Sequence, residues 1–547
     1  MNKPQPHSRA YADLREHIAR LDAAGLLYRI DEPVNKDTEL HPLVRWQFRG
    51  GIAEKDRKAF LFTHVVDSKG RRYGMPVAVG TFAANPEIYR IGMNVERLED
   101  IGPAWTRAVA DPIPPRIVEA APVHEIIITG EALKTNGLDT LPIPISTPGF
   151  DAAPYLTMTG VVTKDPDTGI HNMGTYRTQV KGPTRLGLTM FAAVRAGGLE
   201  HWKKHAKAKT RMPVAIVLGA PPLVAFQGPQ KLRADLDELG VAGALAGEPI
   251  RVVRGKTVDL LVPAEAEIVI EGTVDPEYLE PEGPFGESHG YVALEDYNFV
   301  IDVTAITHRK GAIFSSIISQ VTPSESSVVK KLAYEPMFLS HLRDHLGIKG
   351  ILRVSMHEPL TNLRRFVFLQ FARGTPKTEV WRGLHGALTL QAIVGKFVVA
   401  VNDDIDPENA DAVFWAMAYR CNPIEDTHIV PFRDAGHAPR NEDRLAFESA
   451  LLIDATLKGD MPPLALPKRE YMENARALWE RLGLPALKPE SPWHGYSLGD
   501  WEEEWDRNAE AAARSEWQLH DEFYRQRRRR GVNPNTPARI VEKKDND

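Results

Sequence analysis

Between residues 124 and 320 the chain is a succession of short apolar segments separated by turns, and this pattern constrains its fold more than any other feature. The segments PYLTMTGVVT (154–163) and IHNMGTYRTQV (170–180) flank the turn sequence DPDTG, which predicts a hairpin. Further strand patterns continue through DLLVPAEAEIVIEG to NFVIDVTAITH. Such a series predicts a sheet-rich, barrel-like central domain.

The regions on both sides of this stretch alternate between strand and helix patterns. Residues 8–30 predict a helix that is capped by Ser8 and closed by Gly25, followed by a strand. After residue 320, helices and strands alternate as in β-α-β units. We therefore predict a multidomain α/β and α+β fold with an N-terminal α/β domain (1–123), the central domain (124–320), a C-terminal α/β domain (321–465) and a charged helical extension (466–547). Within this extension, residues 501–530 predict one long exposed helix.

The composition excludes several classes of protein. The chain has 547 residues and a formal charge of −6, from 67 Lys and Arg against 73 Asp and Glu, which argues against a nucleic-acid partner. Its single cysteine, Cys421, excludes an internal disulfide framework and a cysteine-clustered metal site. No run approaches the about 18 apolar residues of a membrane span, and the N-terminus is too polar for a signal peptide. We expect a large cytoplasmic enzyme.

The segment PEGPFGESHG (281–290) is the first candidate for chemistry. Its prolines and glycines fix an irregular backbone, so Glu282 and Glu287 lie on a stiff loop rather than on a helix surface. Paired carboxylates on such a loop suit acid–base catalysis, because burial and mutual repulsion push one pKa upward. The alternative is a surface turn with ordinary acidic residues.

The second candidate is the segment from Asn172 to Arg177, NMGTYR. In a regular strand these two residues point to opposite faces, but Gly174 permits a bulge that turns both toward one site. Asparagine supplies an oxygen ligand, and arginine supplies a forked cationic donor for a carboxylate or a phosphate. The alternative is a plain barrel strand with a solvated arginine.

Six segments together resemble the UbiD-like family of prenylated-FMN-dependent (de)carboxylases, and the resemblance runs over about residues 10–480. The segments are NMGTYRTQVKGPTRLGL (172–188), DELGVAGALAGEPIRVV (237–253), LLVPAEAEIVIEG (260–272), PEGPFGESHGY (281–291), GKFVVAVNDDIDP (395–407) and ALLIDATLKGD (450–460). The resemblance implies an N-terminal α/β domain, a central split-β-barrel that binds the flavin, and a C-terminal α/β domain that assembles dimers or hexamers.

The resemblance also implies roles for individual residues. Asn172 and Glu238 match positions that hold a divalent metal, usually manganese, against the flavin phosphate, with K⁺ nearby in some members. One position departs from the family: Arg195 stands where several members have a metal-ligating histidine, and it could pair with the phosphate instead. The cofactor would further be lined by Thr175, Tyr176, Arg177 and Lys396, and the catalytic set would be Arg177, Glu282 and Glu287.

The reaction implied is non-oxidative decarboxylation of an aromatic or α,β-unsaturated carboxylic acid. The iminium carbon of the cofactor would bond the substrate carbon, CO₂ would leave, and Glu287 would donate the replacing proton. A flavin prenyltransferase would supply the cofactor. Three alternatives stay open: an aromatic acyl-CoA substrate whose phosphates meet the basic tail Arg525–Arg530, the reverse carboxylase, and a catalytically inactive binding or assembly protein. That tail could also contact a neighbouring subunit or simply be a solvated helix end.

Overall fold

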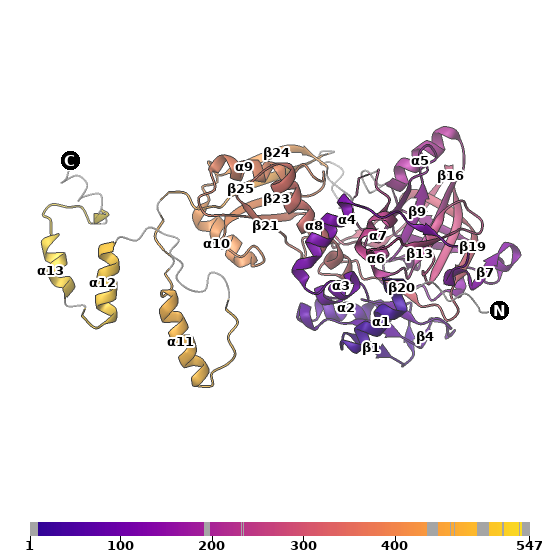
Figure 1. The fold of residues 1–547 in the computed structure, drawn as a ribbon, viewed down its shortest axis with the longest axis horizontal. Coiled ribbons are helices and arrows are strands. Elements are labelled where there is room, and N and C mark those ends of the chain that lie inside the picture. The colour runs from indigo at the N-terminus through magenta and orange to yellow at the C-terminus, as the bar shows by residue number, and fades with distance from the viewer. Residues whose placement is uncertain are drawn as a thin grey trace. The chain divides into compact units, whose positions relative to one another are not determined.

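The computed structural model describes residues 9–190, 197–230, 232–233, 235–434, 447–459, 461–463, 465–489, 503–516, 519–534 and 536–538. It divides into two compact units (Figure 1). The larger unit covers residues 1–403 and 413–456, and the smaller unit covers 404–412 and 457–547. Each is described here by itself.

The N-terminal part of the larger unit contains a four-stranded sheet in the order β1 (Leu27–Ile30), β3 (Ala59–Phe62), β5 (Val77–Val79), β20 (Phe314–Ser316). Its last strand comes from far beyond the others in sequence. A strand pair is formed by β2 (Val34–Asn35) and β4 (Val65–Val66), and the helices of this part are α1 (Leu14–Ala23), α2 (Leu40–Arg49), α3 (Pro86–Met93) and α4 (Ile101–Ala110).

The first helix begins later than the sequence predicts. Its N-cap is Asp13, whose carboxylate accepts a hydrogen bond of 2.9 Å from the Glu16 amide in a capping box. The predicted cap, Ser8, lies outside the described residues. The predicted start of the helix was wrong, because α1 begins at Leu14, directly after Asp13. The predicted stop is confirmed: Gly25 has a φ of +71°, which ends a right-handed helix at low cost.

The predicted sheet-rich central domain is confirmed as a nine-stranded sheet (Figure 1). The predicted hairpin is formed by β9 (Gly160–Lys164) and β10 (His171–Gly174), which pair in antiparallel register with Asn172 opposite Thr163. The order is β10, β9, β13 (Met212–Leu218), β16 (Ile268–Glu282), β19 (Asp296–His308), β12 (Arg185–Leu188), β11 (Thr178–Gly182) and β8 (Tyr155–Leu156), with β7 (Ile126–Thr129) added to β19.

Smaller elements accompany this central sheet. They are the helices α5 (Gly197–Ala208), α6 (Pro222–Ala225) and α7 (Glu238–Ala246), the three-stranded sheet β15 (Leu261–Pro263), β14 (Arg251–Arg254), β6 (Arg116–Ile117), and the pair β17 (Phe285–Gly286) and β18 (Val292–Ala293). Both β17 and the end of β16 belong to the segment 281–290, so this candidate loop lies at the end of a long central strand.

In the C-terminal part of the larger unit, the predicted alternation of strands and helices is confirmed. A five-stranded sheet has the order β21 (Ile351–Met356), β22 (Phe366–Phe371), β23 (Phe397–Asn402), β25 (Glu448–Asp454), β24 (Thr427–Arg433), and β22, β23 and β25 are parallel. Parallel neighbours require crossover connections. The helices are α8 (Glu325–Ser340), α9 (Lys377–Gly386) and α10 (Ala410–Arg420).

The smaller unit contains α11 (Arg469–Arg481), α12 (Glu503–Ala513) and α13 (Leu519–Gln526). The prediction of one long helix over 501–530 was wrong, because Ser515 has a φ of +64° and a left-handed residue ends an α-helix. In the part of the chain that the structure describes, no helix is both long enough and apolar enough to cross a membrane.

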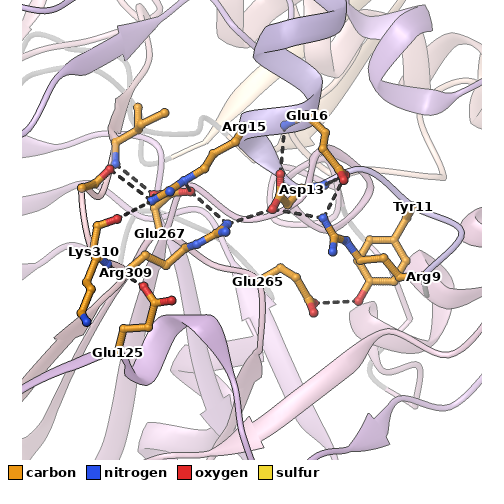
Figure 2. Close-up of polar contacts among 12 residues, drawn as sticks. Arg9, Tyr11, Asp13, Arg15, Glu16, Glu125, Glu265, Glu267, Arg309 and Lys310 are labelled. Carbon is orange, nitrogen blue, oxygen red and sulfur yellow. Dashed lines mark hydrogen bonds and ion pairs between the residues drawn. The ribbon is translucent and has the colours of Figure 1, made fainter. Parts of the chain in front are cut away.

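An ionic network ties α1 to the central sheet (Figure 2). The buried Glu267 accepts hydrogen bonds from Nε and Nη2 of Arg15, both at 2.8 Å. It also accepts one from Arg309 at 3.3 Å and one from the Ile313 amide at 3.0 Å. Arg309 also donates to Asp13 at 2.8 Å. The carboxylate is therefore fully paired, which is the condition under which a buried charge is tolerated.

We expect Glu267→Gln to lower the free energy of unfolding by about 3 kcal/mol, because Arg15 loses its bidentate counter-ion and the half-buried Arg309 keeps only Asp13 among its described ion pairs. Urea denaturation monitored by tryptophan fluorescence measures this change. Arg29→Ala is the control, since Arg29 pairs with Asp22 at 2.7 Å on the surface and exposed pairs contribute less than about 1 kcal/mol. If both variants lost the same free energy of unfolding, the buried network would contribute no more to stability than an exposed ion pair.

Candidate active site around Arg177

Arg177 lies where the chain leaves one strand and enters the next. Strand β10 ends at Gly174 and β11 begins at Thr178, so the single strand predicted over 170–180 is broken. The hydroxyl of Thr159 fixes the connection: it donates to the Tyr176 carbonyl at 2.6 Å and accepts from the Tyr176 amide at 3.2 Å. The pairing of β10 with β9 has no register shift at Gly174, so the predicted bulge is not formed within this strand pair.

The guanidinium of Arg177 contacts both carboxylates of the predicted loop. Its Nε lies 3.1 Å from Oε1 of Glu282 and its Nη2 lies 2.8 Å from Oε2, a bidentate pair. Its Nη1 contacts Oε1 of Glu287. The ring of Phe285 lies 5.1 Å from the guanidinium carbon, a cation–π contact. Arg177 and the two glutamates of the segment 281–290, which lie far from it in sequence, thus form one ionic cluster.

Burial and charge distinguish the members of this cluster. The Glu282 side chain has no exposed surface, whereas Arg177 is 12% exposed and Glu287 is 17% exposed. Burial alone would lower the pKa of Arg177, but the charges of Glu287 and Glu282 raise this pKa above its ordinary value. Arg177 is consequently a permanent cation between two carboxylates, and Glu287 is the carboxylate nearer to solvent.

Asp151 holds the loop that carries Glu287. Its carboxylate accepts the Gly286 amide at 2.9 Å and the Thr147 amide at 2.6 Å, and burial raises its pKa. A Cβ on Gly286 would come within 2.3 Å of the Thr147 hydroxyl oxygen, so a glycine is required there. Sequence reasoning missed Asp151, since a single acid more than 130 positions away carries no local signal.

A second group of side chains lies around Asn172. Glu238 follows the N-cap of α7, is 7% exposed and accepts the amide of Met173 at 2.9 Å, which places it beside Asn172. Burial raises the pKa of the Tyr176 hydroxyl to about 12; the Gly198 amide and the Asn172 side chain oppose this rise, and the charge of Glu238 adds to it. The structure thus brings Asn172, Tyr176 and Glu238 together.

Polar atoms of this second group fit a phosphate-bearing ligand. The Nδ2 of Asn172 and the Oγ1 of Thr175 are buried and have no hydrogen-bond partner among the described residues. A Cβ on Gly197 would lie 1.9 Å from Oδ1 of Asn172, and a Cβ on Gly228 would lie 2.4 Å from Oγ1 of Thr175. Glycines at both positions therefore keep side chains away from these two polar groups.

Of the two remaining predicted residues, Lys396 is not joined to either group by its described contacts, and Arg195 cannot be assigned to one. Lys396 lies at the start of β23, and its ammonium pairs with Glu448 at 2.9 Å; none of its described contacts reaches Arg177 or Asn172. Arg195 lies outside the described residues. Within the described ranges, no three or more His, Cys, Asp and Glu side chains are grouped so that they could hold a metal ion.

The sequence matches three domains of one family. These are the N-terminal domain of 3-octaprenyl-4-hydroxybenzoate carboxy-lyase (UbiD) over residues 18–105, its Rift-related domain over 116–321 and its C-terminal domain over 327–455. A protein of Aquifex aeolicus is 30% identical over 87% of this chain and 99% of its own length. One of Archaeoglobus fulgidus is 31% identical over 86% of this chain and 99% of its own length.

Solved structures with this fold bind a flavin or carry the name of a decarboxylase. An evolved dimeric form of the UbiD-class enzyme HmfF from Pelotomaculum thermopropionicum, in complex with prenylated FMN, is 30% identical over 83% of this chain and 97% of its own, with a TM-score of 0.71. Vanillic acid decarboxylase from Sedimentibacter hydroxybenzoicus in its closed form is 25% identical over 87% of this chain and 100% of its own, with a TM-score of 0.72.

Proposed function

This chain belongs to the UbiD family of carboxy-lyases, and from that membership we propose that it decarboxylates an aromatic carboxylic acid with prenylated FMN as its cofactor. The observation that carries the proposal is the cluster in which Arg177 bridges Glu282 and Glu287. The flavin complex of HmfF and the vanillic acid decarboxylase among its structural relatives support the cofactor and the substrate class.

The group around Asn172 would hold the cofactor. The buried Asn172 Nδ2 and Thr175 Oγ1 are donors that suit a phosphate, and Tyr176 directly follows Thr175. We propose that Asn172 and Glu238 also bind a divalent metal, manganese by preference, whose remaining ligands come from the phosphate and water. Arg177, Arg195 and Lys396 complete the proposed cofactor-binding set, and a flavin prenyltransferase supplies the cofactor.

Each residue of the Arg177 cluster has its own role in the proposed reaction. Loss of CO₂ leaves an electron pair on an sp² carbon, and the bound prenylated FMN supplies the electron sink that amino-acid side chains lack. Arg177 holds the substrate carboxylate, since its fork matches a carboxylate. Glu282 keeps the guanidinium in one orientation. After CO₂ leaves, the carboxyl group of Glu287 gives its proton to the carbon and becomes a carboxylate, which solvent reprotonates.

The test is co-expression with a flavin prenyltransferase, followed by the absorption spectrum and mass of the released cofactor. The holoprotein is then assayed for CO₂ release from aromatic acids and their CoA thioesters. Retention of prenylated FMN and release of CO₂ are expected. Plain FMN or no flavin, together with no CO₂ release and no exchange of labelled bicarbonate into any acid, would overturn the proposal. Exchange without net release would identify the carboxylase direction.

We expect Glu238→Gln to weaken Mn²⁺ binding at least about tenfold, because a neutral amide replaces an anionic ligand. The glutamine oxygen can still accept the Met173 amide, so the fold is kept. Mn²⁺ titration of the FMN-loaded protein by electron paramagnetic resonance measures the affinity. Glu131→Gln, at a side chain that is 86% exposed, is the control. Unchanged affinity in Glu238→Gln would remove Glu238 from the metal site.

A further inference from the structure

Thr189 touches two members of the Arg177 cluster at once. It directly follows β12, and its amide donates to the carbonyl oxygen of Arg177 at 3.3 Å. Its hydroxyl donates to Oε2 of Glu282 at 2.7 Å. One residue therefore contacts the backbone of the cation and the side chain of its counter-ion.

The hydroxyl of Thr189 completes the coordination of Glu282. Oε1 of Glu282 accepts Nε of Arg177, and Oε2 accepts Nη2 of Arg177 and the Thr189 hydroxyl. Asn298 is the next donor, at 3.5 Å from Oε2, which is the limit of a hydrogen bond. Because Glu282 is fully buried, water does not substitute for a lost donor. Removal of the hydroxyl leaves Arg177 as the only donor within 3.2 Å of this carboxylate among the hydrogen bonds of the described residues.

A glycine on β12, the strand that Thr189 follows, leaves room for the Glu282 side chain. Gly187 lies two positions before Thr189, so its missing side chain would point to the same face. A Cβ on Gly187 would come within 3.3 Å of Cγ of Glu282 and 2.9 Å of the Lys181 side chain. At the end of β12, Gly187 therefore leaves room for the Glu282 side chain, and the Thr189 hydroxyl donates a hydrogen bond to it.

We propose that Thr189 is a positioning residue for the decarboxylation, acting through Glu282 on the orientation of Arg177. The inference rests on the proposed function, because it assumes that Arg177 holds the substrate carboxylate. With the hydroxyl in place, the plane of the Glu282 carboxylate is fixed by three donors. Without it, the carboxylate and the guanidinium can rotate together, and Arg177 no longer presents one face to the substrate.

The test compares Thr189→Val, which keeps the shape and removes the hydroxyl, with Thr189→Ser, which keeps the hydroxyl. In the holoenzyme we expect kcat to fall at least about tenfold in Thr189→Val, as for the loss of a hydrogen bond to a charged group, and to stay within about twofold of wild type in Thr189→Ser.

Thr63→Val is the matched control, since the Thr63 hydroxyl donates to Asp31 at 2.5 Å on the surface; wild-type kcat is expected. A crystal structure of Thr189→Val supplies a readout without turnover, and a rotated Glu282 carboxylate is expected. Wild-type kinetics in Thr189→Val, or an unmoved Glu282, would overturn the inference. A loaded wild-type enzyme without turnover would instead overturn the proposed function, and the crystal structure would then decide the role of Thr189.

Discussion

In the holoenzyme, Glu287→Gln lowers kcat by about 10²- to 10⁴-fold and leaves the content of prenylated FMN unchanged. That range is what a positioned general acid contributes. The amide keeps the size of the side chain and the contact of Arg177 with Oε1, but it has no acidic proton for the carbon that loses CO₂. Glu287 belongs to the Arg177 cluster and not to the Asn172 group, so cofactor binding has no reason to change.

The measurement pairs steady-state CO₂ release with the flavin absorbance of the purified variant. Glu280→Gln is the matched control, because Glu280 lies near the end of β16, seven positions before Glu287, and pairs with Arg185 at a partly exposed position. We expect less than about a threefold change in kcat for this control. A Glu287→Gln variant that keeps both its flavin and wild-type turnover would remove Glu287 from the proton transfer.

The sequence alone could predict the elements that depend on local pattern. The hairpin of β9 and β10 and the alternating C-terminal sheet could be predicted, because turn residues and apolar periodicity act over a few positions. The prediction that both glutamates lie on an irregular loop was wrong for Glu282, which is the last residue of β16 and pairs with Asp296 on β19. Membership of β20 in the N-terminal sheet was not readable, since the pairing of Phe314 with Val77 joins residues more than 230 positions apart. Ser515 broke a helix where local propensity favoured continuation.

The residues of the candidate site also include some that the sequence could predict and some that it could not. Glu282 and Glu287 share one motif, and the motif predicted their proximity. Asp151 and Thr189 are single polar residues whose roles come from contacts with that loop across the fold, so no spacing in the sequence could identify them. Tertiary contacts of this kind decide how a catalytic group is held, whereas the motif decides which group is there.

Arg177→Lys is expected to lower kcat/KM by about 10²- to 10³-fold, equivalent to about 2.7–4 kcal/mol of transition-state stabilisation. Lysine keeps the charge, but its ammonium is a single point donor and cannot make the bidentate pair with Glu282 while also reaching Glu287. Either Glu282 or Glu287 is then left without its cation. That unpaired carboxylate would lie beside the position proposed for the substrate, whose own carboxylate it would repel. KM is expected to rise, because the carboxylate of the bound acid loses the planar fork.

Arg185→Lys serves as the control, since Arg185 also pairs with a glutamate but is 42% exposed; a change below about threefold is expected. Combining Arg177→Lys with Glu282→Gln separates direct from indirect action. If Glu282 acts through Arg177, the double variant loses little more than Arg177→Lys alone, since residues that act as a unit are non-additive. Fully additive losses would show that Glu282 contributes to catalysis independently of Arg177, and wild-type kinetics in Arg177→Lys would remove the guanidinium from substrate binding.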